Sequence, residues 1–137
     1  VLLQAGVGGM AAAVAAHARA TWGDAPRIVV VEPAAAPALI ESVRAGRIVT
    51  TTGPLSAMGR LDCKTPSMIA LAGLARDADL FVTLGEEEVG AAVATLAAMG
   101  LRTSASGGAG LAALLCGLEP GPEARVLAIL SEGAVDG

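Results

Sequence analysis

Hydrophobic residues in this chain gather in short runs that alternate with longer segments of helical spacing. Five runs have the length of buried strands: residues 1–3, 28–31, 48–49, 80–82 and 126–130. Such alternation is typical of βαβ units, in which helices cover both faces of a parallel sheet. The pattern therefore predicts an α/β fold, a single three-layer αβα lobe over residues 1–137 with a mostly parallel, doubly wound sheet.

The segments between these runs carry residues that start and stop helices. Pro37 can begin a helix that Gly46 ends, Ser67 can cap a second, and the acidic run 86–88 favours the first turn of a third. An alanine-rich segment follows the first run, and a glycine-rich one begins at Ser106. The predicted helices span residues 10–20, 37–45, 67–76, 86–100 and 106–116.

The first predicted strand is followed directly by a glycine cluster. Gly6, Gly8 and Gly9 stand just before the first predicted helix. Glycine tolerates positive φ and lets a ligand approach the backbone closely. The first N–H groups of a helix have no intrahelical acceptor, and the positive end of the helix dipole favours an anion. This turn therefore predicts a site for a phosphate group.

The same residues also fit the fingerprint of a dinucleotide-binding fold. Gly6, Gly8 and Ala11 have the required spacing, and Glu32 ends the second strand, where its carboxylate could hold a ribose hydroxyl. The loop by itself leaves three alternatives: a dinucleotide, another phosphate compound, or close packing of strand and helix. Ligands of open α/β sheets gather beyond the carboxyl ends of the strands, so this turn and the segment after residue 130 are candidates to share one pocket.

Composition and charge exclude several classes of function. Hydrophobic residues make up 54% of the chain and charged residues 16%, which favours a folded protein, and no apolar run reaches the ~20 residues of a membrane helix. Nine basic residues are scattered along a chain of net charge −4, so no nucleic-acid partner is expected. Two distant cysteines, Cys63 and Cys116, and one histidine predict neither a disulfide nor a metal site. Free thiols favour a cytoplasmic location.

Five stretches of the chain, taken in order, resemble one family of enzymes. They are "LQAGVGGMA" from Leu3, "VVVEP" from Val29, "LDCKTPS" from Leu61, "SGGAGLAALL" from Ser106 and "LSEGAVD" from Leu130. On these residues the chain resembles the C-terminal half of the pyridoxal-phosphate-dependent lyases of the tryptophan-synthase-β-like superfamily, also called fold type II. Within that superfamily it is most similar to the diaminopropionate ammonia-lyases.

The resemblance implies a cofactor, a site and a reaction. The cofactor is pyridoxal 5'-phosphate, with its pyridine nitrogen beside Ser131. Its phosphate would be bound by backbone N–H groups of Gly6, Val7, Gly8, Gly9 and Met10. A hydroxyl can bond a neutral pyridine nitrogen, which leaves the ring a weaker electron sink than a carboxylate would, and a weaker sink suits elimination. The implied reaction is an α,β-elimination on an amino acid such as 2,3-diaminopropionate, which releases ammonia and a 2-oxo acid.

The resembled enzymes need a lysine that forms a Schiff base with the cofactor and moves the α-proton. The only lysine here is Lys64, which lies downstream of the glycine turn, whereas the family's Schiff-base lysine lies upstream. We therefore interpret Lys64 as a surface loop residue and name no catalytic residue in this chain. Because the chain also starts inside a predicted strand, we expect an N-terminal part with that lysine to be missing and the fragment to be inactive alone.

Two further expectations come from the resemblance. The intact enzyme is implied to be a homodimer that acts on a small-molecule amino acid. Ala105 stands where the family commonly has an acidic residue, which is a departure close to the predicted pocket.

Overall fold

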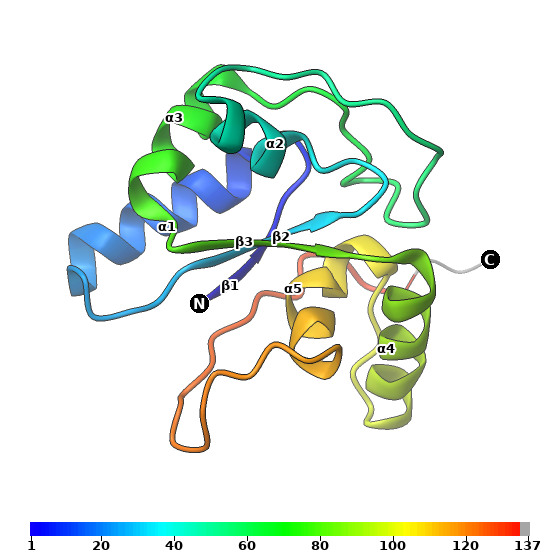
Figure 1. Cartoon of the computed structure of the whole chain (residues 1–137). Helices are drawn as coiled ribbons and strands as arrows, with labels where there is room; N and C mark the ends of the chain where they lie inside the picture. The colour runs from blue at the N-terminus through cyan, green and yellow to red at the C-terminus, as the bar shows by residue number, and fades with distance from the viewer. Residues whose placement is uncertain (135–137) are drawn as a thin grey trace.

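A parallel sheet lies at the centre of the computed structural model, which describes residues 1–134 (Figure 1). The elements follow one another as β1 (Leu2–Gln4), α1 (Gly9–Trp22), β2 (Val29–Pro33), α2 (Ala38–Ala45), α3 (Met68–Asp77), β3 (Leu80–Leu84), α4 (Glu86–Ala98) and α5 (Ala105–Leu115). The predicted α/β class is confirmed.

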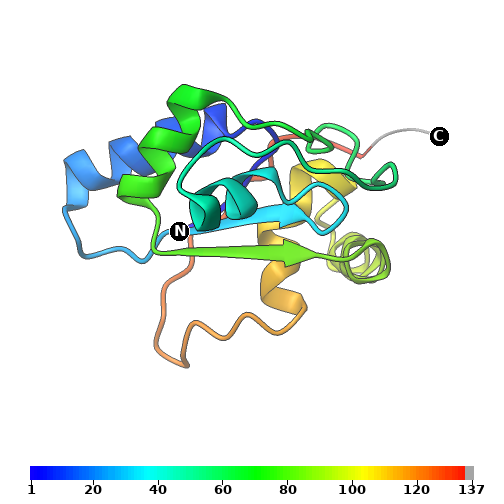
Figure 2. The ribbon, with the colours of Figure 1, turned by 45° about the horizontal axis from the view of Figure 1, so that its top comes forward.

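The sheet has the order β1-β2-β3, and all its strands are parallel. Leu3 pairs with Val30, and Val30 pairs with Phe81. Figure 2 shows β2 and β3 side by side with their arrows in the same direction. Because parallel strands end at the same edge, the turns that follow Gln4 and Pro33 leave the sheet together.

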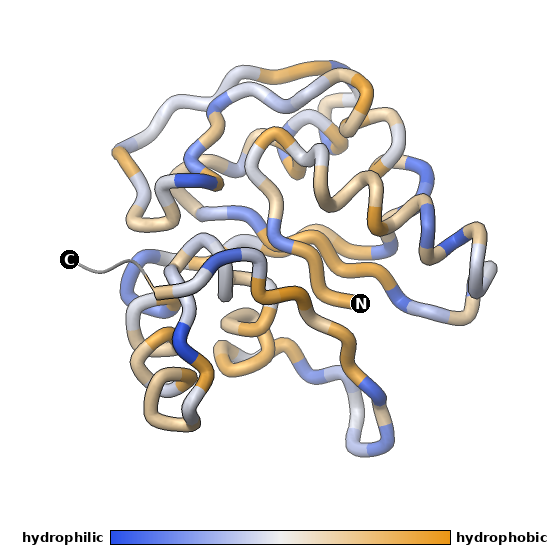
Figure 3. The backbone as a smooth tube through the Cα atoms, turned by 180° about the vertical axis from the view of Figure 1, so that it is seen from behind, coloured by the Kyte–Doolittle hydropathy of each residue, from blue (hydrophilic) through white to orange (hydrophobic). Residues whose placement is uncertain are grey.

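Successive strand residues point to opposite faces of the sheet, and each face packs against its own helices. Leu3 and Val30 belong to the core shared with α1, α2 and α3, which lie above the sheet in Figure 1. Leu2 and Val31 belong to the core shared with α4 and α5, below the sheet. The hydrophobic residues of β1 and β2 form continuous runs (Figure 3), as burial on both faces requires, and the polar residues Gln4 and Glu32 stand near the carboxyl ends of these strands. The predicted three-layer lobe is confirmed.

Helix boundaries follow the local capping chemistry. Ser67 caps α3 as predicted, since its hydroxyl accepts a hydrogen bond from the first turn. Glu88 accepts from the N–H of the residue before α4, so the acidic first turn is also confirmed. α5 starts one residue earlier than predicted, because Ser104 caps it: Ser104 Oγ accepts from the Gly107 N–H at 2.9 Å. None of the helices within residues 1–134 is long and apolar enough to cross a membrane.

Two predicted strands do not form ladders in the sheet. In the segment 48–49, the N–H of Val49 donates to Ser42 Oγ at 2.9 Å, so this backbone pairs with α2. The segment 126–130 forms an isolated parallel bridge between Leu2 and Ala128. Beyond this bridge the carbonyl of Ile129 accepts a side-chain hydrogen bond, which takes the place of a ladder bond.

Candidate functional site

The turn after β1 needs glycine because neighbouring atoms leave little room for side chains. Gly8 has a φ of +97°, and a Cβ placed there would lie 3.1 Å from the Cβ of Ala70 and 3.2 Å from Cδ1 of Leu39. A Cβ at Gly6 would lie 3.0 Å from Sγ of Cys63. The turn is therefore held close to α2, α3 and the loop that carries Cys63.

The N-terminus of α1 opens onto free space at the end of this turn. α1 begins at Gly9, and its N-cap residue, Gly8, has no side chain to accept a hydrogen bond from the first turn. A Cβ at Gly9 would meet no atom within 4 Å, and the side chains of Val7 and Met10 are exposed. Because the first N–H groups of a helix lack intrahelical acceptors, the turn presents backbone donors and the positive end of the helix dipole to a ligand.

Ser131 faces the same space as the glycine turn, although the two lie at opposite ends of the chain. A cavity of about 200 Å³, which we call the cradle cavity, has both in its wall. The residues that line it are Gln4, Ala5, Gly6, Val7, Gly8, Gly9, Met10, Ala11, Arg60, Leu61, Cys63 and Ser131. The six residues predicted to contact the cofactor thus surround one cavity.

Ser131 is held at the cavity by bonds to β1 and α5. Its N–H donates to the carbonyl of Gly107 at 3.3 Å. The Nε2 of buried Gln4 donates to Ser131 Oγ at 2.9 Å, and it also contacts the carbonyls of Gly107 and Ile129. These bonds attach the segment 129–131 to the carboxyl end of β1 and to the first turn of α5.

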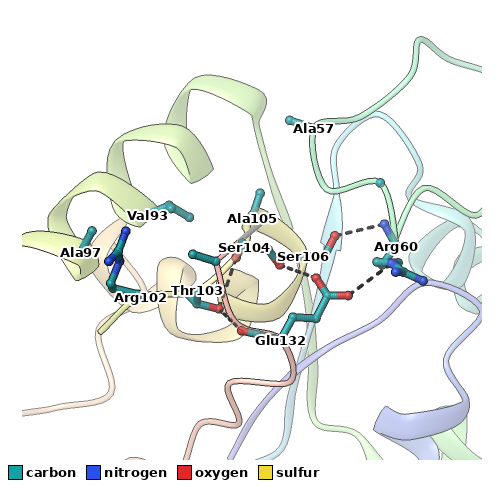
Figure 4. Close-up of a pocket in the computed structure, with 12 residues that line it drawn as sticks. Ala57, Arg60, Val93, Ala97, Arg102, Thr103, Ser104, Ala105, Ser106 and Glu132 are labelled. Carbon is teal, nitrogen blue, oxygen red and sulfur yellow. Dashed lines mark hydrogen bonds and ion pairs between the residues drawn. The ribbon is translucent and has the colours of Figure 1, made fainter. Parts of the chain in front are cut away.

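The next residue, Glu132, anchors this segment on the N-terminus of α5 (Figure 4). Its carboxylate accepts from the Ser104 hydroxyl, and its Oε1 lies 3.5 Å from Nε of Arg60. The hydroxyl of Thr103 donates to the Glu132 carbonyl at 2.8 Å. A helix N-terminus favours a carboxylate in this position. A second cavity, of about 770 Å³, lies beside these residues, and Arg60 lines both cavities.

Glu32 takes no part in this site, which corrects the dinucleotide alternative. The side chain is fully buried, and its oxygens accept from the N–H groups of Leu39 at 2.7 Å and Ile40 at 2.9 Å. Burial raises the pKa of Glu32 to about 7, although these two backbone hydrogen bonds act to lower it. Because both oxygens are bonded inside the protein, the carboxylate is not available to a ribose hydroxyl.

Lys64 lies in a surface loop, as predicted, with 27% of its side chain exposed, but its ammonium is also bonded within the fold. Its Nζ donates to the carbonyls of Ala35 and Pro54, both at 2.8 Å, and to Oδ1 of Asp62 at 2.6 Å. The ammonium has three protons, and each therefore has an acceptor. The hydrogen bond from Lys64 is also the main reason why the pKa of Asp62 lies below its ordinary value.

The cradle cavity offers donors to an anionic group and a hydroxyl to a hydrogen-bond acceptor. The comparison with known families shows which cofactor carries both groups. A family model described as pyridoxal-phosphate dependent enzyme matches residues 1–132. The chain belongs to this pyridoxal-phosphate-dependent enzyme family. The predicted cofactor, pyridoxal phosphate, is the cofactor of the family. A comparison with curated protein sequences gave no match.

Several solved structures share the fold of this pyridoxal-phosphate-dependent chain. The threonine deaminase of T.th. is 26% identical with a TM-score of 0.77, over 83% of this chain and 42% of that one. Diaminopropionate ammonia lyase from Escherichia coli is 26% identical with a TM-score of 0.72, over 83% and 30%. Maize serine racemase, at 23% identity and a TM-score of 0.77 over 82% and 34%, is similar in fold. The chain thus spans less than half the length of each of these enzymes.

The residues of the cradle cavity fit pyridoxal phosphate. Backbone N–H groups at a helix N-terminus suit a phosphate, and the hydroxyl of Ser131 suits a ring nitrogen. Space for the phosphate exists at Gly9, where a Cβ would meet no atom within 4 Å. Arg60 also lines this cavity, and its guanidinium pairs with Glu132 beside it.

Two polar residues of the cavity wall, Gln4 and Arg60, were not predicted from the sequence. Gln4 is a polar residue inside a buried hydrophobic strand, and such a residue indicates a hydrogen-bonding role in the interior. Arg60 lies in an irregular loop, where no periodic pattern predicts its direction. Val135 and Asp136, which end the last stretch of the family resemblance, lie outside the described residues.

Proposed function

We propose that this chain forms the cofactor-binding lobe of a pyridoxal-phosphate-dependent lyase that carries out α,β-elimination on an amino acid. The reaction removes ammonia from a substrate such as 2,3-diaminopropionate and gives a 2-oxo acid. When bound, pyridoxal phosphate supplies the electron sink that stabilises negative charge at the α-carbon of the substrate. The observation that carries the proposal is the cradle cavity, in whose wall the glycine turn and Ser131 meet.

The glycine turn supports the phosphate contact. The backbone N–H groups of residues 6–10 would donate to phosphate oxygens, and the dipole of α1 would favour their negative charge. Gly6 and Gly8 are pressed against neighbouring atoms, so the turn is fixed by packing before any ligand binds. Arg60 would add a positive charge, which its ion pair with Glu132 partly offsets.

Ser131 supports the ring-nitrogen contact and, with it, the elimination chemistry. A serine hydroxyl does not ionise near neutral pH, so it does not stabilise a protonated pyridine nitrogen as a carboxylate does. A ring with an unprotonated nitrogen withdraws electrons less strongly. This favours rapid loss of a β-substituent over reactions that require prolonged negative charge at the α-carbon.

We infer that the lysine bonded to the cofactor comes from a part of the enzyme beyond this chain. Lys64 is the only lysine of the chain, its ammonium already has three acceptors, and it is not among the residues that line the cradle cavity. On this proposal the chain binds the cofactor but does not turn over substrate alone. A homodimer and a cytoplasmic location remain predictions.

The elimination class draws support from two similar enzymes. The two structures at 26% identity are named as a deaminase and an ammonia lyase. Ala105, where the resembled family commonly has an acidic residue, lies in the wall of the larger cavity and leaves that position uncharged. Because these two enzymes are named for threonine and diaminopropionate, the rates with these two amino acids are the ones to compare. In the whole enzyme we expect ammonia and a 2-oxo acid to appear together, and inversion of the substrate without ammonia release would contradict elimination.

Calorimetric titration with pyridoxal phosphate and with pyridoxal tests the phosphate cradle. We expect the phosphate form to bind at least about tenfold more tightly, because each hydrogen bond to a charged group contributes about 1.5–3 kcal/mol. Gly9→Glu places a carboxylate at the open N-terminus of α1 and is expected to remove this difference. Gly90→Glu is the matched control, since it adds the same charge at an exposed glycine of α4 whose Cβ would meet no atom within 4 Å.

Equal affinity of the unaltered chain for pyridoxal phosphate and pyridoxal would contradict the proposal. The same holds if Gly9→Glu binds the phosphate form as tightly as Gly90→Glu does. Ammonia release by the chain alone that disappears in Lys64→Met would contradict the assignment of the lysine to another part of the enzyme.

A further inference from the structure

Gln4 connects the carboxyl end of β1 to Ser131 across the floor of the cradle cavity. Only 1% of its surface is exposed. Its Nε2 donates to the carbonyl of Gly107 at 3.0 Å, to the carbonyl of Ile129 at 2.9 Å and to Ser131 Oγ at 2.9 Å. An amide nitrogen has two protons, so the bond to the hydroxyl is shared with the carbonyls.

The two carbonyls fix the direction of the Gln4 amide. Carbonyl oxygens only accept hydrogen bonds, so Nε2 must face them, and a reversed amide would place Oε1 against both oxygens. Oε1 is buried and has no hydrogen-bond partner within residues 1–134. It lies so close to α5 that a Cβ at Gly110 would be 2.8 Å away. An unpaired buried oxygen costs free energy. The hydrogen bonds that Nε2 makes in this orientation must therefore outweigh the cost of leaving Oε1 without a partner.

The direction of this amide decides where the proton of Ser131 can point. An amide nitrogen cannot accept a hydrogen bond, so the hydroxyl accepts from Gln4 and its own proton must point elsewhere. Within residues 1–134, Gln4 is the one hydrogen-bond partner that Ser131 Oγ has. Ser131 lines the cradle cavity, and a hydroxyl that accepts one hydrogen bond becomes a stronger donor in the next.

We propose that Gln4 is a positioning residue, which acts through Ser131 so that the serine proton is donated into the cradle cavity to an unprotonated ring nitrogen. This inference rests on the proposed function, in which that ring belongs to pyridoxal phosphate. Without this N–H, as in Gln4→Met, the serine hydroxyl could donate to the carbonyls of Gly107 and Ile129 that Nε2 leaves free, and an oxygen lone pair would then face the ring. Gln4 thereby helps to keep the ring a weak electron sink.

A pair of ligands that differ at one atom separates this role from a merely structural one. The ligands are pyridoxal phosphate and its carbocyclic analogue, in which C–H replaces the ring nitrogen. We expect the unaltered chain to prefer pyridoxal phosphate by about three- to tenfold, the contribution of one neutral hydrogen bond. Ser131→Ala should bring this ratio to unity. Gln4→Met, which keeps the volume of the side chain but has no N–H, should move the ratio in the same direction.

The double variant Gln4→Met with Ser131→Ala should have the same ratio as Ser131→Ala alone, because Gln4 acts through the hydroxyl. If Gln4→Met weakens both ligands equally and keeps the ratio, Gln4 has only a structural role and the inference is wrong. Should Gln4→Met fail to fold, Gly110→Ala takes its place, since the added Cβ would lie 2.8 Å from Oε1 and 3.2 Å from the carbonyl oxygen of Leu2, and the amide at the end of a flexible side chain moves more easily than the strand. An unchanged ratio in that variant would also count against the inference.

The nitrogen-15 resonance of ring-labelled pyridoxal phosphate reports the protonation state directly. In the complex with the unaltered chain we expect the unprotonated form to persist to lower pH than in the Gln4→Met complex. A ring nitrogen that titrates identically in both complexes would overturn the role of Gln4. Failure of the unaltered chain to bind pyridoxal phosphate at all would instead overturn the proposed function, and this inference with it.

Discussion

Of the helices that start at the carboxyl edge of the sheet, α1 has an open N-terminus and α2 does not. After β1, the turn 6–10 leads to α1, whose first residues line the cradle cavity. After β2, the turn 34–37 leads to α2, whose N–H groups at Leu39 and Ile40 donate to the Glu32 carboxylate at 2.7 and 2.9 Å. We call these the open turn and the closed turn.

The two turns differ in where the anion comes from. A helix N-terminus attracts negative charge in both places. In the closed turn the chain supplies a buried carboxylate of its own, whereas in the open turn glycines remove the side chains that could do the same. Position at the carboxyl edge of a parallel sheet therefore does not by itself make a ligand site. An internal carboxylate can occupy the position first.

The largest expected effect comes from the pH dependence of the closed turn. Burial raises the pKa of Glu32 from an ordinary 4.5 to about 7, so the folded state binds more protons than the unfolded state between these values. The stabilising contribution of the protonated side chain is fully present below about 4.5 and is lost as the pH rises through about 7. We expect the free energy of unfolding to fall by about 3 kcal/mol across this window through Glu32.

Glu32→Gln is the control for this pH dependence because its side chain does not titrate. Urea denaturation of both proteins between pH 5 and 8 measures the difference in slope, which removes the contribution of other groups. If the free energies of unfolding of the two proteins change in parallel with pH, or if the unaltered chain gains stability relative to Glu32→Gln as the pH rises, the carboxylate is not buried as described.

The second effect comes from adding a methyl group where the open turn is already packed against α2 and α3. Gly8→Ala forces a Cβ onto a backbone with φ of +97° and brings it within 3.1 Å of Ala70. We expect a loss of about 1–3 kcal/mol in the free energy of unfolding, together with weaker binding of pyridoxal phosphate. Gly9→Ala is the matched control, because its Cβ meets no atom within 4 Å. Equal stability of the two variants in urea denaturation would remove the evidence for a packed turn.

The open turn and the sheet could be predicted because their causes are local. Apolar runs of strand length, interrupted by helical segments, already fix three layers. Gly8 has a positive φ that glycine adopts without strain, and this requirement lies in the residue itself, so the sequence predicts the turn at this position. That the glycine turn and Ser131 share one cavity could be predicted from the rule that ligands lie beyond the carboxyl ends of parallel strands.

The closed turn could not be predicted, because the direction of one side chain decides its chemistry. Glu32 stands at the end of a strand, where a carboxylate can face a ligand or turn back to the next helix. The direction of the Glu32 side chain depends on how the turn places the N–H groups of Leu39 and Ile40, which donate to its carboxylate. The segment 126–130 is apolar like a strand, but the side chain of Gln4 takes the carbonyl of Ile129 that a ladder would use. No local sequence pattern predicts that a side chain rather than a backbone N–H will bind this carbonyl.

The smallest effect on stability comes from the hydrogen bond that Lys64 makes to the closed turn. Lys64 donates to the carbonyl of Ala35 within this turn, as well as to Pro54 and Asp62. Lys64→Met keeps the unbranched stem but removes these bonds, so we expect a lower unfolding midpoint than the unaltered chain, with a smaller change than Gly8→Ala gives, because the lysine is partly exposed.

The pH profile of Lys64→Met shows whether the lost ion pair causes this change. The pKa of Asp62 is held down mainly by the hydrogen bond from Lys64, so this carboxylate contributes stability above its unfolded pKa and loses it as the pH falls. The difference between the variant and the unaltered chain should therefore shrink in acid. Binding of pyridoxal phosphate should stay unchanged, because Lys64 does not line the cradle cavity. A folded Lys64→Met variant that no longer binds the cofactor would place this lysine at the open turn, and the division between the two turns would then fail.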